Sequence, residues 1–415
     1  MAAALTIEDI QAARQRIADG VYLSPCPESI PLSELCGMHI FCKLDYLQRT
    51  GSFKERGARN ALLLMSDDKR RRGVIAASAG NHALGLAYHG QLLGINVTVV
   101  MPRFAPLIKV TTCRNFGARV ILEGENYADA QTKALELAAR DGLTFVPGFD
   151  DAAVVAGQGT IALEVLQQVP QTDAIVVPVG GAGLIAGVAL AAKTLKPDIK
   201  IIGVEAASAP GFGAAMMAGH PIETTVRPTL ADGLAVSRVG EIPFEIARTR
   251  VDKLVTVTEE SLSLAVLRLI ELEKSIVEGA GAAPLAACMG NQLESLQGKN
   301  VVLLLCGGNI DLTVLGRIIE RGLVADGRLC RFTAVVSDRP GGLAKAAQLI
   351  GQCGASIKDV EHDRAFSGAD LTAVNVMWTV ETADRAHIAE LYRRLGEAGV
   401  PVVPSTQVVE VGVPG

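Results

Sequence analysis

Short apolar runs rich in Val and Ile alternate with segments of helical period along the first three quarters of the chain. Apolar runs bounded by Gly, Pro or Asn are typical of buried strands, and apolar residues spaced three or four apart are typical of helices. Strands are expected at 73–79, 95–102, 118–124, 143–149, 174–179, 199–205 and 300–306, with helical segments between them. Because strands that alternate with helices pair in parallel, this pattern predicts an α/β protein.

The longest uncharged stretch, residues 174–192, approaches the length of a membrane span. Pro178 and the pair Gly180–Gly181 interrupt it, and both residue types break a continuous helix. We interpret this stretch as a buried strand followed by a buried helix, and we expect no contact with a membrane.

The pattern changes after the polar segment 322–331. The remaining residues follow the order strand, helix, strand, strand, helix, strand over about 85 residues, which is the ferredoxin-like arrangement. We therefore expect a first domain at 1–325 and a second at 331–415. The outer strands of such a sheet are able to pair with another copy, so we expect a homo-oligomer, either a dimer or a tetramer.

The composition excludes several classes of partner. The net charge is −5, and the 39 basic and 44 acidic residues are mixed along the chain, so nucleic acid is not expected to bind.

Eight cysteines without a CxxC pair favour reduced thiols over disulfides or zinc. Residues 1–17 have the pattern of an amphipathic helix and lack the apolar core of a signal peptide. We therefore expect a cytoplasmic protein.

A glycine-rich loop at 180–183 lies between an expected strand and an expected helix. Free N–H groups and the helix dipole favour an anion at such a position, which predicts a phosphate site. Gly181, Gly183 and Gly187, followed by Glu205, also resemble a dinucleotide fingerprint, which would indicate an NAD-dependent oxidoreductase. The glycines equally suit tight packing of the strand on the helix.

Three further segments carry groups suited to chemistry. Lys54 lies in GSFKERG just before an apolar helix, where the spacing alone fits a surface charge as well as a functional amine. The segment 78–82, SAGNH, ends a strand and begins a helix, so its N–H groups suit a carboxylate, or Ser78 or Asn81 caps the helix. Cys306 ends a strand in CGGN, where α/β sheets bind ligands, although a buried Cys is often only a core residue.

Together, GSFKERGA, SAGNH, the GGAG loop and CGGNIDL resemble, in order and spacing, the fold-type II pyridoxal-phosphate (PLP) enzymes. Within them the chain resembles the threonine/serine dehydratases over about residues 5–325. The resemblance implies two parallel-sheet subdomains, with a small one at about 45–155 inserted in the larger. The tail, with SDRPGGLAKAAQLIGQCG, resembles the ACT regulatory domain that some of these dehydratases carry.

The resemblance assigns roles to matching positions. Lys54 is the residue that forms the aldimine with PLP and, once freed as a neutral amine of lowered pKa, removes the Cα proton of the substrate. Asn81 bonds the ring hydroxyl oxygen, and Cys306 faces the pyridine nitrogen. The phosphate is held by Gly180, Gly181, Ala182, Gly183 and Leu184. The substrate is bound by Ser78, Ala79, Gly80, Asn81 and His82, of which His82 is expected to orient the loop rather than act as a base.

The implied reaction is dehydration and deamination of L-threonine to 2-oxobutanoate and ammonia, and of L-serine to pyruvate. Relatives usually have Ser at Cys306, and a neutral thiol leaves the ring nitrogen unprotonated, which disfavours transamination. Serine racemases carry a second Ser where this chain has Ala79, so elimination is expected over racemisation. Serine racemase, 3-hydroxyaspartate ammonia-lyase and β-replacement remain alternatives, as does an amino-acid sensor without catalytic activity.

Several positions stay open at this stage. Glu205 and Ala209 match cation ligands of some relatives, but Gly211 replaces the third, acidic ligand, and cation sites depend on carboxylate charge. Asp232–Leu234 and Glu278–Gly281 match segments that line the pocket of relatives. The alternative is that these residues only form turns or helix ends. In the tail, Asp338 and Pro340–Gly341 match the place where ACT domains hold an amino-acid effector such as isoleucine, valine or serine.

Overall fold

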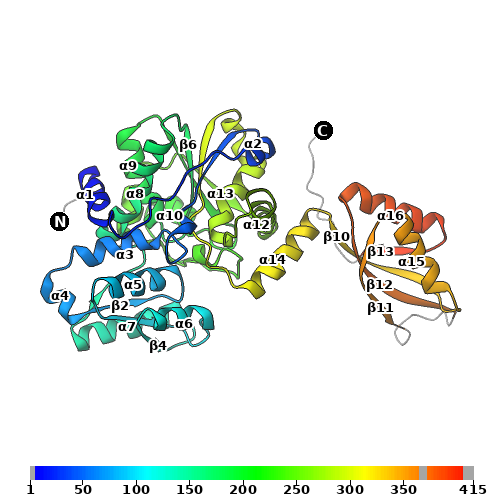
Figure 1. Cartoon of the computed structure of the whole chain (residues 1–415), viewed down its shortest axis with the longest axis horizontal. Coiled ribbons are helices and arrows are strands. Elements are labelled where there is room, and N and C mark those ends of the chain that lie inside the picture. The colour runs from blue at the N-terminus through cyan, green and yellow to red at the C-terminus, as the bar shows by residue number, and fades with distance from the viewer. Residues whose placement is uncertain (1–4, 364–371, 405–415) are drawn as a thin grey trace. The chain divides into compact units, whose positions relative to one another are not determined.

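The computed structural model describes residues 5–363 and 372–404, and the chain divides into two compact units, residues 1–315 and 316–415 (Figure 1). The division falls inside α14 (Leu312–Ala325), a few residues before the polar segment at which the sequence pattern changes. Residues 405–415, which include the end of the expected last strand, lie outside the described residues.

The first unit contains a five-stranded parallel sheet in the order β1-β9-β6-β7-β8. Its strands are β1 (His39–Lys43), β9 (Asn300–Leu304), β6 (Ala174–Pro178), β7 (Lys200–Ala206) and β8 (Lys253–Val257). The three central strands are at predicted positions, whereas the two edge strands, β1 and β8, were not predicted. Every residue of β6 is buried, as expected of a strand covered on both faces.

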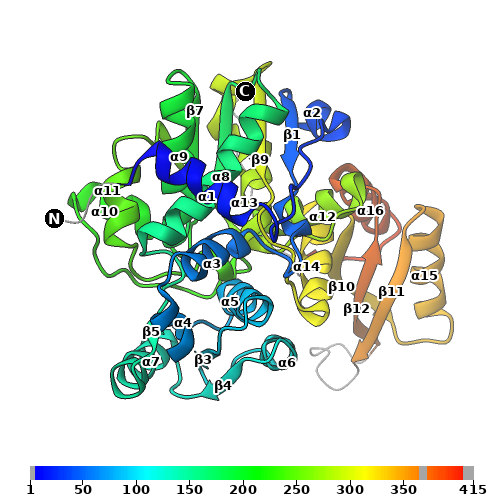
Figure 2. The same ribbon diagram turned by 60° about the vertical axis from the view of Figure 1, so that its left-hand side comes forward.

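A second parallel sheet of the same unit has the order β4-β3-β2-β5. Its strands are β2 (Val74–Ala77), β3 (Val97–Met101), β4 (Arg119–Leu122) and β5 (Thr144–Phe145), all inside predicted ranges. The two sheets form separate groups, with α3 (Lys54–Leu63) between them (Figure 2). Because α3 packs on α8 (Ala152–Gln168) and α5 (Asn81–Leu92), the helix that begins with Lys54 is held from both sides.

The remaining helices of the unit cover the sheets. They are α1 (Ile7–Ile17), α2 (Ile30–Cys36), α4 (Asp67–Arg72), α6 (Leu107–Asn115), α7 (Tyr127–Asp141), α9 (Gly183–Leu195), α10 (Gly211–Ala218), α11 (Glu241–Ala247), α12 (Glu259–Glu273) and α13 (Gly279–Met289), with short 3-10 turns η1 (Asp45–Leu47), η2 (Asp232–Leu234) and η3 (Asn291–Leu296). The amphipathic helix expected within residues 1–17 is confirmed as α1, which begins at Ile7.

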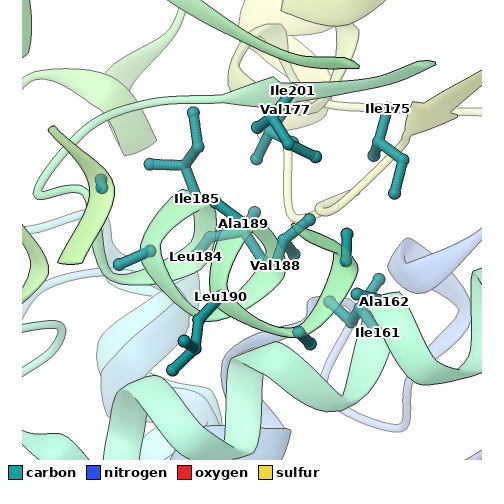
Figure 3. Packing of buried hydrophobic residues seen from close by; sticks show 14 of the residues in the cluster. Ile161, Ala162, Ile175, Val177, Leu184, Ile185, Val188, Ala189, Leu190 and Ile201 are labelled. Atoms are coloured by element: carbon teal, nitrogen blue, oxygen red, sulfur yellow. The ribbon is translucent and has the colours of Figure 1, made fainter. Parts of the chain in front are cut away.

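The uncharged stretch 174–192 forms β6 and most of α9, as predicted. Figure 3 shows Ile185 and Val188 of α9 against Val177 and Ile201 of the sheet. Its apolar side chains thus belong to the core of the protein. Among residues 5–363 and 372–404, no helix combines the length and the apolar character needed to cross a bilayer.

Gly187 explains part of the apparent dinucleotide fingerprint. A Cβ at this position would collide with the carbonyl oxygen of Val155 and lie 2.6 Å from the nitrogen of Gly159, both in α8. The glycine therefore allows α8 and α9 to cross closely, which is a requirement of packing and needs no nucleotide.

Replacing Gly187 with alanine is expected to destabilise the first unit by about 1–3 kcal/mol, because an added methyl group in a closely packed crossing displaces backbone. Thermal unfolding followed by far-ultraviolet circular dichroism measures this. Gly316→Ala is the matched control, since a Cβ there meets nothing within 4 Å and alanine favours a helix by up to about 1 kcal/mol. An unchanged melting temperature for Gly187→Ala would refute the close crossing.

The second unit has the predicted ferredoxin-like order. Its elements are β10 (Leu329–Ser337), α15 (Gly342–Gln352), β11 (Ser356–Asp363), β12 (Ala373–Glu381), α16 (Arg385–Glu397) and β13 (Val402–Pro404). The strands pair antiparallel in the order β11-β12-β10-β13. Phe332, Trp378, Ile350 and Leu391 are fully buried between the sheet and its two helices, so this unit has a core of its own.

Candidate active site

A cavity of about 310 Å³ lies at the carboxyl ends of β2, β6 and β9. It is lined by groups from all four sequence motifs: Lys54, Ser78, Ala79, Gly80, Asn81, His82, Gly180, Gly181, Ala182, Gly183, Leu184 and Cys306. The segments 232–234 and 278–281 contribute Asp232, Gly233, Leu234, Glu278, Ala280 and Gly281. Glu205 and Ala209 are not in the lining. The structure therefore brings together residues that the sequence predicted separately, at the sheet edge where parallel folds bind ligands.

Lys54 is half-buried in this cavity rather than a surface charge. Its Nζ donates a hydrogen bond of 2.6 Å to the carbonyl oxygen of Gly148. Burial lowers the pKa of this amine to about 8, against the opposing pull of the Glu278 carboxylate. Just before it, the N–H of Phe53 bonds the carbonyl oxygen of Cys306 at 3.0 Å, so the turn that carries Lys54 is fixed to the end of β9.

The glycine loop presents unpaired N–H groups to the cavity. Ala182 has φ 68°, and α9 begins at the next residue, Gly183. Within the described part of the chain, the N–H groups of Gly180 to Leu184 donate to no carbonyl or side chain. Together with the positive end of α9 they form a site for an anion such as a phosphate. The loop is also tightly packed, because a Cβ at Gly181 would overlap the ring of Phe149.

The segment Ser78–His82 leads from β2 into α5. Gly80 is the N-cap of α5, so the alternative interpretation, in which Ser78 or Asn81 caps this helix, was wrong. The N–H of Ser78 bonds Val100, and that of Gly80 bonds the Ser78 hydroxyl at 3.3 Å. The N–H groups of Ala79, Asn81 and His82 have no acceptor among the described residues, which leaves three donors at a helix start.

His82 is buried and shares a hydrogen bond of 2.9 Å with the carbonyl oxygen of Val146 through Nε2. Because a carbonyl only accepts, Nε2 carries the proton. Burial, together with the nearby charge of Lys54, lowers the pKa of His82 to about 4. The ring is therefore neutral at physiological pH and adds no charge to the cavity.

Cys306 is buried at the end of β9. Burial raises the pKa of its thiol well above the usual value, and the Asp45 carboxylate acts in the same direction. The group remains a neutral thiol over the working range of pH. All eight cysteines of the chain are free.

Sequence reasoning missed how Asn81 is held. Its Nδ2 donates to Glu278 Oε1 at 2.7 Å, and its Oδ1 accepts from Asn309 Nδ2 at 2.9 Å. Glu278 is the N-cap of α13, and burial, together with the carboxylate of Asp232, raises its pKa to about 7. Asp232 is itself 3.4 Å from Lys109. The only sequence signal for these partners was that 232–234, 278–281 and CGGN occur in pocket-lining segments of the dehydratases.

Glu205 is engaged in the fold. Its carboxylate accepts hydrogen bonds of 2.5 and 3.0 Å from the N–H groups of Phe212 and Gly213, in the first turn of α10. Burial raises its pKa to about 7, against the effect of those two bonds. Within residues 5–363 and 372–404, no group of three or more His, Cys, Asp or Glu side chains is arranged to hold a metal ion. The buried cap leaves no carboxylate free for a ribose hydroxyl, so the interpretation as a dinucleotide site was wrong.

The sequence of residues 17–307 matches the family described as "Pyridoxal-phosphate dependent enzyme". The chain belongs to this family. It is 42% identical to an L-threonine ammonia-lyase of Thermotoga maritima over 96% of this chain and 99% of that protein. Among solved structures, it resembles threonine deaminase isoform 2 of Solanum lycopersicum, with a TM-score of 0.73 and 38% identity over 76% of this chain and 86% of that chain. It also resembles maize serine racemase, with a TM-score of 0.73 and 32% identity over 78% of this chain and 99% of that chain.

The residues in the cavity fit the cofactor of this family, pyridoxal phosphate. The unpaired N–H groups of Gly180 to Leu184 suit a phosphate dianion. The amine of Lys54, with its lowered pKa, suits an aldehyde, because only a neutral amine adds to one. Cys306 places an uncharged group beside them. The four motifs are therefore explained by one ligand.

Proposed function

We propose that the protein converts L-threonine to 2-oxobutanoate and ammonia, and L-serine to pyruvate and ammonia. The observation that carries this proposal is that the amine of Lys54 and the unpaired N–H groups of the glycine loop line one cavity. The names of the relatives support the choice of substrate, since both the Thermotoga protein and the tomato enzyme are named for threonine.

Lys54 moves the proton in this proposal. Its lowered pKa provides a neutral amine near pH 8, and the Gly148 carbonyl holds Nζ in the cavity, so it takes the proton from Cα of the substrate. When bound, pyridoxal phosphate supplies a conjugated ring that spreads the charge left on Cα. Gly180 to Leu184 would hold its phosphate and Asn81 would donate to its ring hydroxyl oxygen, while the neutral thiol of Cys306 would leave its ring nitrogen unprotonated.

The N–H groups of Ala79, Asn81 and His82 bind the substrate carboxylate at the start of α5. Loss of the β-hydroxyl as water and release of ammonia by hydrolysis complete the reaction. Ala79 has no group to return a proton to Cα, so elimination prevails over racemisation. For this reason, we place serine racemase second, despite the likeness to maize serine racemase. We place 3-hydroxyaspartate ammonia-lyase second because the Thermotoga and tomato relatives are named for threonine.

The cofactor assignment is tested by the visible spectrum of the purified protein, followed by reduction with borohydride and mapping of the modified peptide. The proposal expects a yellow protein labelled at Lys54. The substrate is tested by release of 2-oxo acid from threonine, serine and 3-hydroxyaspartate. A yellow protein that releases no 2-oxo acid from any of the three substrates would refute the ammonia-lyase activity but leave the cofactor assignment in place.

We further propose that the second unit is an ACT-like regulatory domain. Maize serine racemase is matched over 99% of its length by 78% of this chain, so the chemistry of that relative needs no such unit. Gly341, with φ 92°, directly follows Pro340 and is the N-cap of α15. The start of this helix, three residues after Asp338, suits the carboxylate of an amino-acid effector. Calorimetric titration with isoleucine, valine and serine tests this, and no heat from any of them would contradict it.

We also propose a homo-oligomer, either a dimer or a tetramer, because the outer strands of the second unit are able to pair with another copy; sedimentation tests this. We place the protein in the cytoplasm, because eight free thiols are stable in a reducing compartment. A divalent cation at Glu205 and Ala209 is not part of the proposal, since the Glu205 carboxylate caps α10.

A further inference from the structure

Asn309 connects three of the motifs that line the cavity, although it does not line the cavity itself. It follows β9 in CGGN, and its Nδ2 donates to the carbonyl oxygen of Thr50 at 2.6 Å and to Oδ1 of Asn81 at 2.9 Å. Its backbone also hydrogen-bonds the carboxylate of Glu278. One side chain thus uses both of its amide protons, one on the segment that carries Lys54 and one on Asn81.

The approach of Asn309 to the Lys54 segment is close. Gly51 has φ 76°, and a Cβ at that position would lie 2.9 Å from Cγ of Asn309 and closer still to its Oδ1. The N–H of Gly308 bonds the carbonyl oxygen of Gly51 at 2.9 Å. The turn 50–53 and the end of β9 are therefore fitted to each other at this asparagine, and a side chain at 51 would be strained and would displace Asn309.

The two contacts of Asn81 decide which way its amide faces. An asparagine amide has nearly the same shape either way round, so only its hydrogen bonds distinguish the oxygen from the nitrogen. The Nδ2 of Asn309 requires an oxygen, and the carboxylate of Glu278 accepts from a nitrogen. If the amide of Asn81 were flipped, both bonds would be lost, because its Nδ2 would face the Nδ2 of Asn309 and its Oδ1 would face the carboxylate of Glu278. The second proton of Asn81 Nδ2 is then available to a ligand oxygen.

We propose that Asn309 is a positioning residue that orients the amide of Asn81 and fixes the turn before Lys54, so that the affinity for pyridoxal phosphate depends on it. This rests on the proposed role of Asn81 as a cofactor ligand. Asn309 itself touches neither cofactor nor substrate and acts through Asn81 and Thr50.

The test measures the dissociation constant of pyridoxal phosphate by absorbance titration of the cofactor-free protein. Asn309→Ala removes both donors and is expected to weaken binding by about 10- to 100-fold, by analogy with the loss of a hydrogen-bond partner of a metal ligand. Asn309→Asp should weaken it at least as much, because its carboxylate only accepts and turns Nδ2 of Asn81 away from Glu278. Binding by Asn309→Ala within twofold of wild type would overturn the proposal.

A double-mutant cycle separates positioning from a general loss of structure. Because Asn309 acts through Asn81 as well as through Thr50, Asn309→Ala should weaken cofactor binding by a smaller factor in the Asn81→Ala background than in the wild type. If the factors by which the two single substitutions weaken binding simply multiply in the double variant, the two residues act independently and the proposal is overturned. Failure of the wild-type protein to bind the cofactor would instead refute the proposed function.

Asn60→Ala is the matched control. Asn60 is also buried, and its Nδ2 donates to the carbonyl oxygen of Ala153 at 2.7 Å, on α3 but outside the cavity lining. Its replacement should lower the melting temperature of the cofactor-free protein and leave the dissociation constant unchanged. An equal loss of cofactor affinity in Asn60→Ala and Asn309→Ala would assign Asn309 to stability alone and overturn the proposal.

Discussion

Replacing Lys54 with alanine is expected to remove the yellow colour of the protein and to lower the release of 2-oxobutanoate from L-threonine by at least about 10³-fold. Among the described residues, two lysines line the cavity, Lys54 and Lys109, and Lys109 pairs with Asp232. Without Lys54, nothing near Gly148 adds to an aldehyde or takes a proton from Cα. Absorbance above 400 nm and a coupled assay of the 2-oxo acid give the two results.

Two variants serve as controls for this result. Lys54→Arg keeps the positive charge but cannot provide a neutral amine, so it should be as inactive as the alanine variant. Lys133→Ala removes a lysine on the surface of α7 and should leave colour and rate unchanged. Retention of colour and of more than a tenth of the activity by Lys54→Ala would assign the chemistry to another residue.

The lowered pKa of Lys54 gives a further expectation for the same assay. Because only the neutral amine reacts, the rate at which cofactor-free protein captures pyridoxal phosphate should rise with pH and reach half its maximum near pH 8. An unperturbed lysine would reach it near about 10.4. A midpoint above pH 10 would show that the amine is exposed in solution.

The site was predictable where a motif follows a buried strand directly. The glycine loop and Cys306 come at the ends of β6 and β9, so the period of the strands was enough to place them. The state of Lys54 was not predictable in this way, because its partner Gly148 is 94 residues further along the chain. The contacts of Asn81 join positions 197 and 228 apart, and no local pattern reports such pairs.

The fold was predicted best in its interior. Every residue of β6 is buried, as is every residue of β7 and β9 after the first, whereas the edge strand β8 has only two buried residues in five positions. The helix α13 was missed because it contains Pro284 and two glycines, which are poor helix formers. It is held instead by burial, since every residue from 279 to 288 is buried. Tertiary packing there overrides local preference.

Arg56 offers the second large effect, this time on stability. It is fully buried two residues after Lys54, and its guanidinium bonds Asp45 at 2.7 and 2.8 Å and Glu164 at 2.6 and 2.9 Å. A second buried cation of this cluster, Lys43, lies 2.6 Å from Glu164. Two cations and two carboxylates thus balance inside the protein and join β1, η1, α3 and α8. Burial alone would raise the pKa of Asp45, but the charge and hydrogen bonds of Arg56 bring it below the usual value.

Arg56→Met is expected to lower the free energy of unfolding by about 3–5 kcal/mol, because it leaves two buried carboxylates with one cation. Urea unfolding followed by far-ultraviolet circular dichroism measures this. Fluorescence is unsuited to the purpose, since the single tryptophan, Trp378, lies in β12 of the second unit. Arg248→Met is the control, because its pair with Glu245 at 2.9 Å is exposed and worth less than about 1 kcal/mol.

The decrease in the free energy of unfolding caused by Arg56→Met should also depend on pH, and the pKa of the Asp45 carboxyl group determines the direction. In the wild type its lowered pKa contributes stability above about pH 4, and this is lost as the pH falls through the folded value. Without Arg56, burial raises that pKa, so the variant loses stability as the pH rises through it. The difference between the two proteins should therefore be larger at pH 7 than at pH 5. An equal difference at both values, or a loss no larger than that of Arg248→Met, would mean that the buried charges do not depend on Arg56.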